Sequence, residues 1–578
     1  MMVSDGHEPL FPSRVVVFVR RRPLDVVLPV GVFVAALVLY VRTMTPGLGG
    51  GIDSAEMQHA AYNLSIVHPT GYPLYLLLAR AFIWLIPFGE VAWRVTLLSA
   101  VVGAVAVVAV YVIAAMLSRS RAGGVLAAGF MATHPLVWQQ ATIAEVNSLN
   151  LLLVATLFLT LVLWGRGATG GKAAEPGWQP PLELSGFLFG LALANHRVSL
   201  LAFPGILIFI VWSARDGRRP SARTILQTVG LALLPLLLYL YIPLRADTTP
   251  WYTNTWDNFW IQVSGESAWP VIRETLQRPF LPRVRRVVEA VFGELRPGTV
   301  RDGTINGLMQ LGGLGLLSIV IGRWWDDSPV RRTVVGLLAP SAVLVAAVMV
   351  VYDVDVIGDY LSMVAMITAV LAAIGTVETI RWLPRIVVGR LSGSGTAERR
   401  EVVVARTAAW LLVVAALAWH GWSVEPRMDR SDDDSARAFW NAVQDLEGTP
   451  AAVGNDALLI GSWNRVNELR YLQSVEGWRR DLQPVLTDDL VHTGRIGLID
   501  EWLGQGRPVY LLEGVPAILD QFRVERQGAT WRITGRGDLE SAVMEHPVNV
   551  RFGDAVELLG YTLDPEQIRT GDALRITL

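Results

Sequence analysis

The sequence predicts an all-α polytopic membrane protein with about eleven transmembrane helices, followed by an extracytoplasmic domain with α/β and β-rich parts. Three observations predict this fold class. Of the 578 residues, 52% are hydrophobic and 17% are charged, whereas a soluble protein has about 25% charged residues. Apolar runs long enough to cross a bilayer recur over the first 425 residues, separated by arginine-rich connectors. After Trp422 the composition becomes polar.

The arginines predict the orientation of the spans, because basic residues favour the cytoplasmic side of a membrane. Arg14 and the cluster at 20–22 precede the first apolar run, so residues 1–23 are expected in the cytoplasm. No small-residue cleavage site follows, so the first run should remain as an anchor. Threading the chain in this way places every strongly basic short loop inside. The predicted spans are 24–43, 95–117, 122–138, 148–165, 183–196, 198–213, 224–243, 305–322, 333–352, 360–380 and 405–422.

The same threading divides the chain into a membrane domain, residues 24–425, and a C-terminal region. The membrane domain has two large external loops, 44–94 and 245–304. Alternating short helix and strand patterns predict an extracytoplasmic α/β domain over 432–515, and residues 516–578 look β-rich.

The chain end and the cysteine content give two further expectations. The last run, residues 572–578, has the pattern of a strand without a partner, so we expect the chain to continue beyond Leu578. The sequence contains no cysteine, which excludes disulfides and thiolate metal sites.

Polar residues gather at the predicted external ends of the spans, where charge close to a bilayer is costly and needs a reason. They come from five separate segments, and we expect them to meet near one interface. The candidate site residues are Asp53, Glu56, His68, Tyr72, Glu145, Asn147, His196, Arg197, Arg245, Tyr352, Asp355 and Asp359.

These residue types suit an anionic lipid-linked substrate. Arginines bind a phosphate, an apolar groove holds the lipid tail, and a carboxylate performs acid–base chemistry. A transporter or lipid flippase would instead place ionisable residues near the membrane midplane and show two related halves, and neither is visible in the sequence. A membrane anchor that displays a binding domain is the other alternative, and it would leave the loop carboxylates dispensable.

Each signal also has a simpler structural explanation. The spacing of Asp53 and Glu56 is that of a capping box variant, and Glu145 with Asn147 could cap the fourth span. The remaining alternatives are a turn and helix start at 68–73, interfacial anchoring by His196, Arg197 and Arg245, solvation of the acidic turn 353–359, and an interfacial belt formed by Trp138, Trp251, Trp256 and Trp260.

Several segments resemble a bacterial membrane-protein family related to the eukaryotic protein O-mannosyltransferase that acts on plexins and receptor kinases, a member of the GT-C glycosyltransferases. The resemblance covers roughly residues 24–380 in order. It is carried by Asp53-Ser54-Ala55-Glu56, by the run from His68 to Tyr75, and by residues 141–150, 194–197 and 241–245. Family members often have an aromatic residue before the first aspartate, where this chain has Ile52.

The resemblance implies a polyprenyl-phosphate-linked monosaccharide donor, with mannose as the family's sugar, and inverting transfer outside the cytoplasm to a hydroxyl of a protein or glycan. Asp53 matches the acidic residue proposed as general base, and Glu56 is the alternate base or a ligand of sugar hydroxyls. Arg245 and Arg197 are the candidates for binding the phosphate, with His196 as helper.

The expected cofactor content is none. Asp53, Glu56, Asp355 and Asp359 could hold Mg²⁺ or Mn²⁺ through oxygen ligands, but the related O-mannosyltransferases are thought not to need a metal. The expected location is the cytoplasmic (inner) membrane, with the lipid bilayer, the lipid-linked sugar and the acceptor as partners and no nucleic acid.

Overall fold

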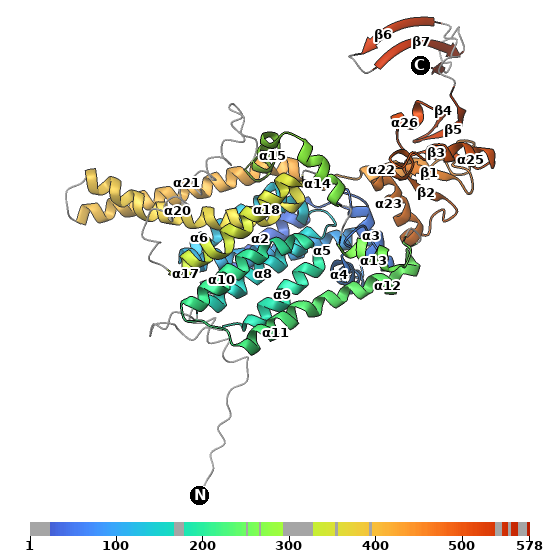
Figure 1. The fold of residues 1–578 in the computed structure, drawn as a ribbon. Helices are drawn as coiled ribbons and strands as arrows, with labels where there is room; N and C mark the ends of the chain where they lie inside the picture. Colours follow the sequence, from blue (N-terminus) through green and yellow to red (C-terminus); the bar gives the residue numbers. More distant parts are fainter. Residues whose placement is uncertain are drawn as a thin grey trace. The chain divides into compact units, whose positions relative to one another are not determined.

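The computed structural model describes residues 23–166, 179–249, 252–264, 268–292, 328–352, 357–391, 396–537, 546–552, 556–564 and 575–577 (Figure 1). The chain folds as two compact units. The membrane unit contains Met1–Ala438 and Asn467–Trp478, and the C-terminal unit contains Phe439–Val466 and Arg479–Leu578.

Within the described residues, eight helical stretches are long and apolar enough to cross a membrane, which confirms the predicted polytopic helical fold. They are Leu24–Thr43, Val91–Ser118, Asn147–Arg166, Arg197–Arg215, Ala222–Thr248, Arg332–Val351, Ser362–Trp382 and Arg400–Met428. Each coincides with a predicted span. The predicted span 183–196 coincides with a shorter apolar helix, Leu182–Asn195, and the predicted span 305–322 lies outside the described residues.

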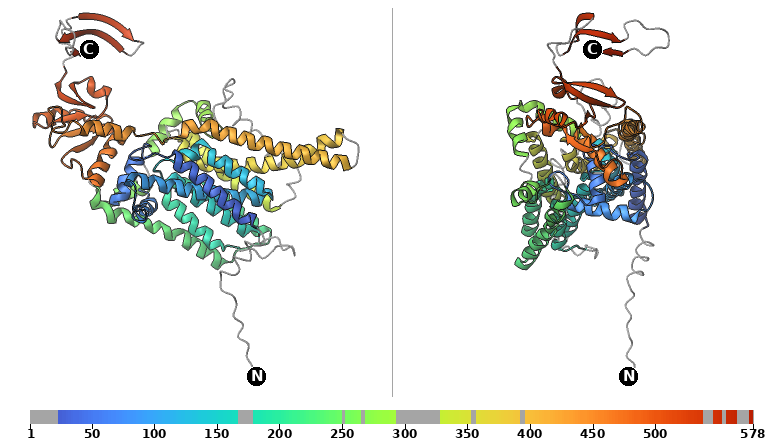
Figure 2. Two further views of the ribbon diagram at one scale, coloured as in Figure 1. Left: turned by 180° about the vertical axis from the view of Figure 1, so that it is seen from behind. Right: turned by 90° about the vertical axis from the view of Figure 1, so that its right-hand side faces the viewer.

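The long helices of the membrane unit run side by side along a roughly common direction (Figures 1 and 2). The long helices and their extensions are α2 (Leu24–Thr43), α5 (Val91–Ser118), α6 (Arg121–Thr133), α7 (Pro135–Ala141), α8 (Asn147–Arg166), α9 (Leu182–Asn195), η1 (Arg197–Ala202), α10 (Phe203–Arg215), α11 (Ala222–Leu233), η2 (Leu234–Leu240), α17 (Ser328–Arg331), η5 (Arg332–Leu338), α18 (Ala339–Val351), α20 (Ser362–Leu391) and α21 (Thr396–Met428). The helices between spans are α3 (Ser54–Asn63), α4 (Pro73–Leu85), α12 (Tyr241–Arg245), η3 (Ala246–Thr248), α13 (Trp256–Ser264), α14 (Ala268–Gln277), α15 (Phe280–Phe292) and α19 (Ile357–Tyr360).

The predicted span 122–138 is divided between α6 and α7 rather than forming one helix. The break falls at His134, which adopts an extended backbone. Pro135 lacks the N–H that would continue the ladder of α6, and it is well suited to the first turn of a new helix. His134 Nδ1 accepts a hydrogen bond from Leu136 N at 3.2 Å and so caps α7.

Small residues set the closest helix packing. A Cβ atom at Gly186 would lie 2.4 Å from the carbonyl oxygen of Thr228, and one at Gly190 would lie 2.1 Å from that of Ala232. These two glycines, four residues apart on α9, therefore let α9 and α11 approach each other at backbone distance, as in other membrane helix pairs.

The C-terminal unit contains a five-stranded sheet in the order β2-β1-β3-β5-β4. Strands β1 (Leu458–Gly461), β2 (Gln483–Leu486) and β3 (Val509–Leu511) are parallel. Strands β4 (Phe522–Gln527) and β5 (Thr530–Arg536) form an antiparallel hairpin that joins the sheet beside β3. The remaining helices are α22 (Ser435–Gln444), which begins in the membrane unit, α23 (Trp463–Tyr471), which ends in it, η6 (Leu472–Glu476), which lies wholly in it, and α24 (Thr487–Val491), α25 (Leu498–Gly504) and α26 (Pro516–Leu519) of the C-terminal unit.

Two details of the C-terminal unit differ from the sequence-based expectation. The sheet of the α/β domain runs to Arg536, not to about 515, because the β4–β5 hairpin pairs with β3. A second sheet contains β6 (His546–Phe552), β7 (Val556–Asp564) and β8 (Arg575–Thr577). The prediction that the last strand lacks a partner was wrong, because β8 pairs antiparallel with β7.

Candidate active site

Asp53 and Glu56 lie at the start of α3, in the loop that follows the first span. Asp53 is at the N-cap position, but its side chain makes no capping hydrogen bond. The side chain of Asp53 is 30% exposed, whereas that of Glu56 is 2% exposed. The capping-box alternative therefore does not describe this pair, and the two carboxylates occupy very different environments.

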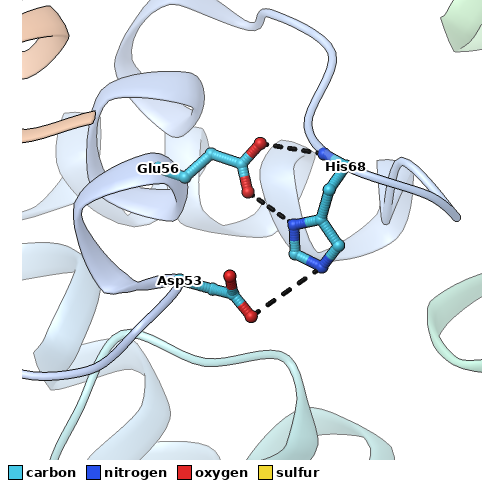
Figure 3. Close-up of side chains that lie close together, drawn as sticks. All are labelled: Asp53, Glu56 and His68. Carbon is cyan, nitrogen blue, oxygen red and sulfur yellow. Dashed lines mark hydrogen bonds and ion pairs between the residues drawn. The ribbon is translucent and has the colours of Figure 1, made fainter. Parts of the chain in front are cut away.

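Glu56 holds His68 through both of its carboxylate oxygens (Figure 3). Oε1 accepts a hydrogen bond from the His68 backbone N–H at 2.8 Å, and Oε2 lies 2.5 Å from the ring atom Nδ1. The other ring nitrogen, Nε2, faces Asp53 Oδ2 at 3.8 Å. The imidazole is thus fixed in one orientation, with its far nitrogen directed at the more exposed carboxylate.

The charge of His68 is set by these neighbours. Burial by itself would lower the pKa of His68, but the Glu56 carboxylate, through its charge and its hydrogen bond, outweighs burial, and Asp53 and Glu145 add to its effect. Together they raise the pKa of His68 from 6.5 to about 9. The site therefore holds an imidazolium cation between two carboxyl groups at neutral pH.

The loop between α3 and α4 presents His68 in a tight turn. Gly71 N donates to His68 O at 2.8 Å, and both Gly71 and Tyr72 have positive φ, at 78° and 40°. Pro73 then occupies the first turn of α4. The simpler explanation of residues 68–73, a turn followed by a helix start, is correct as local structure, and the same turn delivers His68 to the two carboxyl groups.

A row of five rings leads away from the carboxyl groups. His68 meets Tyr72 edge-on at 5.2 Å between ring centroids, and Tyr72 stacks on His196 at 5.8 Å. His196 contacts Tyr360 at 5.6 Å, and Tyr360 contacts Tyr352 at 5.7 Å. The row joins the loop between α3 and α4, the turn between α9 and η1, and the residues that flank the acidic turn, which the sequence predicted to meet.

His196 is neutral and offers a hydrogen-bond donor. Burial lowers the pKa of His196 to about 3, and the charges of Arg197 and His68 act in the same direction. Its Nδ1 accepts from Val198 N at 3.1 Å, capping η1, so the ring proton resides on Nε2. His196 can therefore donate a hydrogen bond to an anion, but it carries no positive charge that would attract the anion.

The two candidate arginines have different local roles. The Arg197 guanidinium binds the carbonyl of Ser264, at the end of α13, and its charge acts on Tyr72, which places it near the ring row. Arg245 donates from Nε to Leu64 O and from Nη2 to Asn63 O, both at 2.7 Å. These are the last carbonyls of α3, so Arg245 serves as a cap at the C-terminal end of that helix. Its role as a phosphate ligand stays a prediction.

Glu145 and Asn147 lie in the buried turn between α7 and α8. The charge of Glu145 contributes to the raised pKa values of His68 and Tyr72, which places the carboxylate near the cluster. Glu145 Oε2 also accepts from Val146 N at 3.0 Å. Asn147 Nδ2 donates to Gln140 Oε1 at 3.0 Å and so secures the turn before α8. Asp355 and the side chain of Asp359 lie outside the described residues.

Helix α3 is held on its remaining faces by neighbours within the membrane unit. His59 Nε2 lies 3.1 Å from Asn467 Oδ1, and burial lowers the pKa of His59 to about 4, so that ring is neutral. Gln58 Oε1 accepts from Gly49 N at 3.0 Å, which fixes the approach of the chain to Asp53. These two contacts hold α3, and with it Asp53, in place.

The sequence did not reveal the residues that bind the loop between α3 and α4, residues 64–72, called here the His68 loop. Tyr241, Thr249 and Gln262 bind its backbone, although they are about 180 residues away along the chain. Tyr360, which completes the ring row, directly follows the acidic turn that the sequence singled out, but it was not among the candidate site residues. None of these carries a spacing or charge signal, because their roles depend only on where the helices bring them.

The ligand atoms of Asp53, Glu56 and His68 lie within 4.8 Å of one another, the spacing of a possible divalent metal site. Their donor set of carboxylate oxygen and imidazole nitrogen suits Mn²⁺ or Zn²⁺. However, both oxygens of Glu56 already accept hydrogen bonds from His68. These residues fit a metal only if that pairing opens, and the expected absence of a cofactor stays a prediction.

An apolar groove of about 450 Å³ lies beside the start of α4. Apolar side chains of α4, α9 and η2 line this groove. The lining residues are Leu74, Phe187, Leu191, Leu234, Pro235, Leu237 and Leu238. Leu74, which lines the groove, is two residues from Tyr72 of the ring row along the chain.

Comparison with solved structures identifies the fold. ArnT from Cupriavidus metallidurans, bound to undecaprenyl phosphate, superposes with a TM-score of 0.51 at 12% identity, over 88% of this chain and 97% of that chain. The oligosaccharyltransferase of Archaeoglobus fulgidus, in complex with Zn and sulfate, gives a TM-score of 0.51 at 13% identity, over 84% and 67%. The fold is therefore that of the GT-C membrane proteins, as predicted.

Comparison by sequence points to one branch of that class. Residues 53–218 match the family described as the protein O-mannosyl-transferase TMEM260 N-terminal domain. Protein O-mannosyl-transferase TMEM260 of Mus musculus is 36% identical over 217 residues, which are 38% of this chain and 30% of the mouse protein. The Dictyostelium discoideum protein of the same name is 30% identical over 191 residues, 32% of this chain and 23% of that protein.

These matches confirm the resemblance to the protein O-mannosyltransferases. The chain matches less than a third of the length of these curated relatives. The matched family segment begins at Asp53 and includes Glu56, His68, His196 and Arg197, whereas Arg245 and the acidic turn lie beyond it.

Proposed function

We propose that the chain is an extracytoplasmic inverting glycosyltransferase that moves mannose from a polyprenyl-phosphate donor to a hydroxyl acceptor, a Ser or Thr of a protein. The observation that carries the proposal is the accessible carboxylate of Asp53 beside the His68–Glu56 pair. The names of the similar proteins supply the sugar and the kind of acceptor.

In this proposal Asp53 is the general base. Its side chain is 30% exposed and can reach an acceptor hydroxyl. Asp53 takes the hydroxyl proton as the acceptor oxygen attacks the anomeric carbon, and the bond from that carbon to the phosphate oxygen breaks, leaving its electron pair on the lipid phosphate. Attack from the face opposite the leaving group inverts the anomeric centre.

Glu56 acts as a positioning residue in this reaction and not as the base. It is 2% exposed, and both of its oxygens bind His68, so it has no free path to an acceptor. The His68 imidazolium keeps the Asp53 carboxyl oriented and places positive charge beside a departing phosphate.

The donor would lie along the ring row with its lipid tail in the apolar groove. Leu74 of the groove is two residues from Tyr72 along the chain, and the Nε2–H of His196 and the guanidinium of Arg197 are near the Tyr72 ring. This arrangement supplies a hydrogen-bond donor and a cation for the phosphate where the groove meets the site.

We also propose the orientation predicted from the arginines, with the N-terminus in the cytoplasm and the site outside the inner membrane. The residues of the site gather at the ends of spans opposite the basic connectors that contain Arg166, Arg215 and Arg219. Protection of a reporter fused at the N-terminus from an external protease tests this orientation, and cleavage of that reporter in sealed cells would contradict it.

The function is tested by comparing purified wild type with Asp53→Asn in lipid nanodiscs, with polyprenyl-phosphate mannose as donor and Ser/Thr peptides as acceptors. Because general base catalysis contributes about 10²- to 10⁴-fold to rate, we expect transfer to fall by that factor while donor binding is kept. Wild-type turnover with an equally active Asp53→Asn variant would remove Asp53 from the mechanism. Movement of the donor across the bilayer without transfer would support a flippase instead.

A further inference from the structure

We propose that residues 241–249 and 252–264, called here the clamp segment, position the His68 loop with one face and bind the lipid headgroup layer with the other. The inference rests on the proposed function for its effect on turnover, but the two contacts themselves can be measured without activity. Within these two ranges the clamp segment contains α12, η3 and α13.

The inner face of the clamp segment binds four consecutive residues of the His68 loop through their backbone. The pairs are Arg245 Nε with Leu64 O at 2.7 Å, Tyr241 Oη with Ser65 O at 2.9 Å, Thr249 Oγ1 with Ile66 N at 2.8 Å, and Gln262 Nε2 with Val67 O at 2.6 Å. Glu56 binds the backbone N–H of the next residue, His68. Five residues in a row are therefore fixed by side chains from elsewhere, and the loop cannot slide without breaking several bonds.

These bonds are shielded from water. Tyr241, Thr249 and Gln262 are 8%, 3% and 4% exposed. A backbone group of the loop that lost its partner here would stay buried and unpaired, so the loop would have to shift to recover a partner. Such a shift moves His68 relative to Asp53, because His68 follows directly after Val67.

The outer face of the same segment is apolar and exposed. Leu244, Trp256 and Trp260 are 78%, 74% and 56% exposed. Trp256 and Trp260 are four residues apart on α13 and so share one side of that helix, whereas Gln262 points inward.

The occupant that this face fits is the membrane–water interface. Residues 241–248 of the segment form the end of the candidate span Ala222–Thr248, and residues 252–264 follow it, so the outer face lies where that span ends. Tryptophan is enriched at this depth because its ring has an apolar body and a polar N–H. Helix α13 therefore connects lipid on one side to the catalytic loop on the other, and its seating in the interface sets the position of His68.

The inner contact is tested at Thr249. Thr249→Val keeps the shape but removes the oxygen that accepts from Ile66 N, whereas Thr249→Ser keeps that oxygen. Thr253→Val, at an exposed threonine of the same segment, is the matched control. We expect Thr249→Val to lower kcat by about tenfold or more with donor binding unchanged, since small misplacements of reacting groups have effects of this size, and Thr249→Ser to restore most of it.

Hydrogen exchange provides a readout that does not depend on transfer. We expect faster amide exchange over residues 64–68 in Thr249→Val than in wild type, Thr249→Ser or Thr253→Val. Equal exchange in all four proteins, or equal turnover of Thr249→Val and wild type, would overturn the positioning role. Absence of transfer by wild type with every lipid-linked sugar would count against the proposed function and leave the exchange result to decide the clamp.

The outer contact is tested with single cysteines, which are unique labelling sites because the natural chain has none. A fluorophore is attached to Trp256→Cys or to Asp257→Cys, an exposed neighbour on a different side of α13, with the protein in nanodiscs. We expect lipids brominated near the headgroup to quench the label at 256 more than at 257, and aqueous iodide to do the reverse. Iodide quenching at 256 as strong as at 257, or shielding of 256 from both quenchers, would overturn the membrane contact in favour of solvent or a protein partner.

Discussion

The His68 loop and the clamp segment contact each other, but they contribute to the site in opposite ways. The His68 loop carries chemically distinctive side chains and is held mainly through its backbone. The clamp segment contributes ordinary side chains, Tyr241, Thr249 and Gln262, whose task is to bind that backbone. The side chains proposed to act on the substrate and the side chains that fix their position therefore come from separate parts of the chain, about 180 residues apart.

An irregular loop has few internal hydrogen bonds, so its buried backbone groups need partners from outside. Here those partners also determine where the His68 ring lies. The comparison therefore predicts two kinds of variant. Substitutions of the carboxyl and imidazole side chains should remove the groups that act on the substrate. Substitutions in the clamp segment should change where those groups lie.

After Asp53, the largest effect on turnover is expected at Glu56. Glu56→Gln removes the carboxylate that orients and charges His68, so we expect kcat to fall by about 10²-fold, a typical cost of misaligned catalytic groups. Initial rates of transfer measure the effect, with Glu90→Gln, an exposed acid paired with Arg437, as control. Wild-type turnover in Glu56→Gln would show that His68 needs no such partner.

The two arginines offer the next test, because the structure gives them different roles. Arg245→Ala leaves the carbonyls of Asn63 and Leu64 without their donor, so we expect the free energy of unfolding to fall by about 1–3 kcal/mol. Arg197→Ala should instead raise the KM for the donor with little change in stability. Thermal unfolding and donor titration separate the two outcomes, and the reverse assignment would make Arg245 the phosphate ligand.

The smallest predicted effect is a pH dependence of stability. The pKa of His68 is raised from 6.5 to about 9 by its carboxylate neighbours, so its contribution is fully present below pH 6.5 and is lost as the pH rises through about 9. We expect the difference in Tm between wild type and Glu56→Gln to be largest at or below pH 6.5 and to shrink toward pH 9. A difference that stays constant over this range would contradict the raised pKa.

Much of the fold was predictable because long apolar runs and arginine-rich connectors leave few alternatives. Among the described residues, eight of the predicted spans coincide with helices long enough to cross a membrane, and a ninth coincides with a shorter apolar helix. The break at His134 was missed because Pro135 lies inside an apolar run that reads as one span. The partner of the last strand was missed because pairing of β8 with β7 is a contact that no local pattern records.

The candidate site was predictable only in part. Charged and imidazole side chains next to a membrane are conspicuous, and Asp53, Glu56 and His68 do come together. The different burial of the two carboxylates was not predictable. Glu56 is buried and Asp53 is accessible, and the proposed roles of the two residues depend on this difference. Gln262 and Thr249 were beyond prediction, because a threonine or glutamine between two spans has no local feature that reveals its partner.

The central claim is that this chain transfers a sugar from a lipid phosphate to a hydroxyl. The most direct measurement supplies purified wild type with labelled mannose, linked either to polyprenyl phosphate or to a nucleotide, and determines the anomeric configuration of any product. We predict a product from the lipid-linked donor only, with the configuration inverted. Transfer from the nucleotide-linked sugar, retention of configuration, or no product from any lipid-linked sugar would contradict the account.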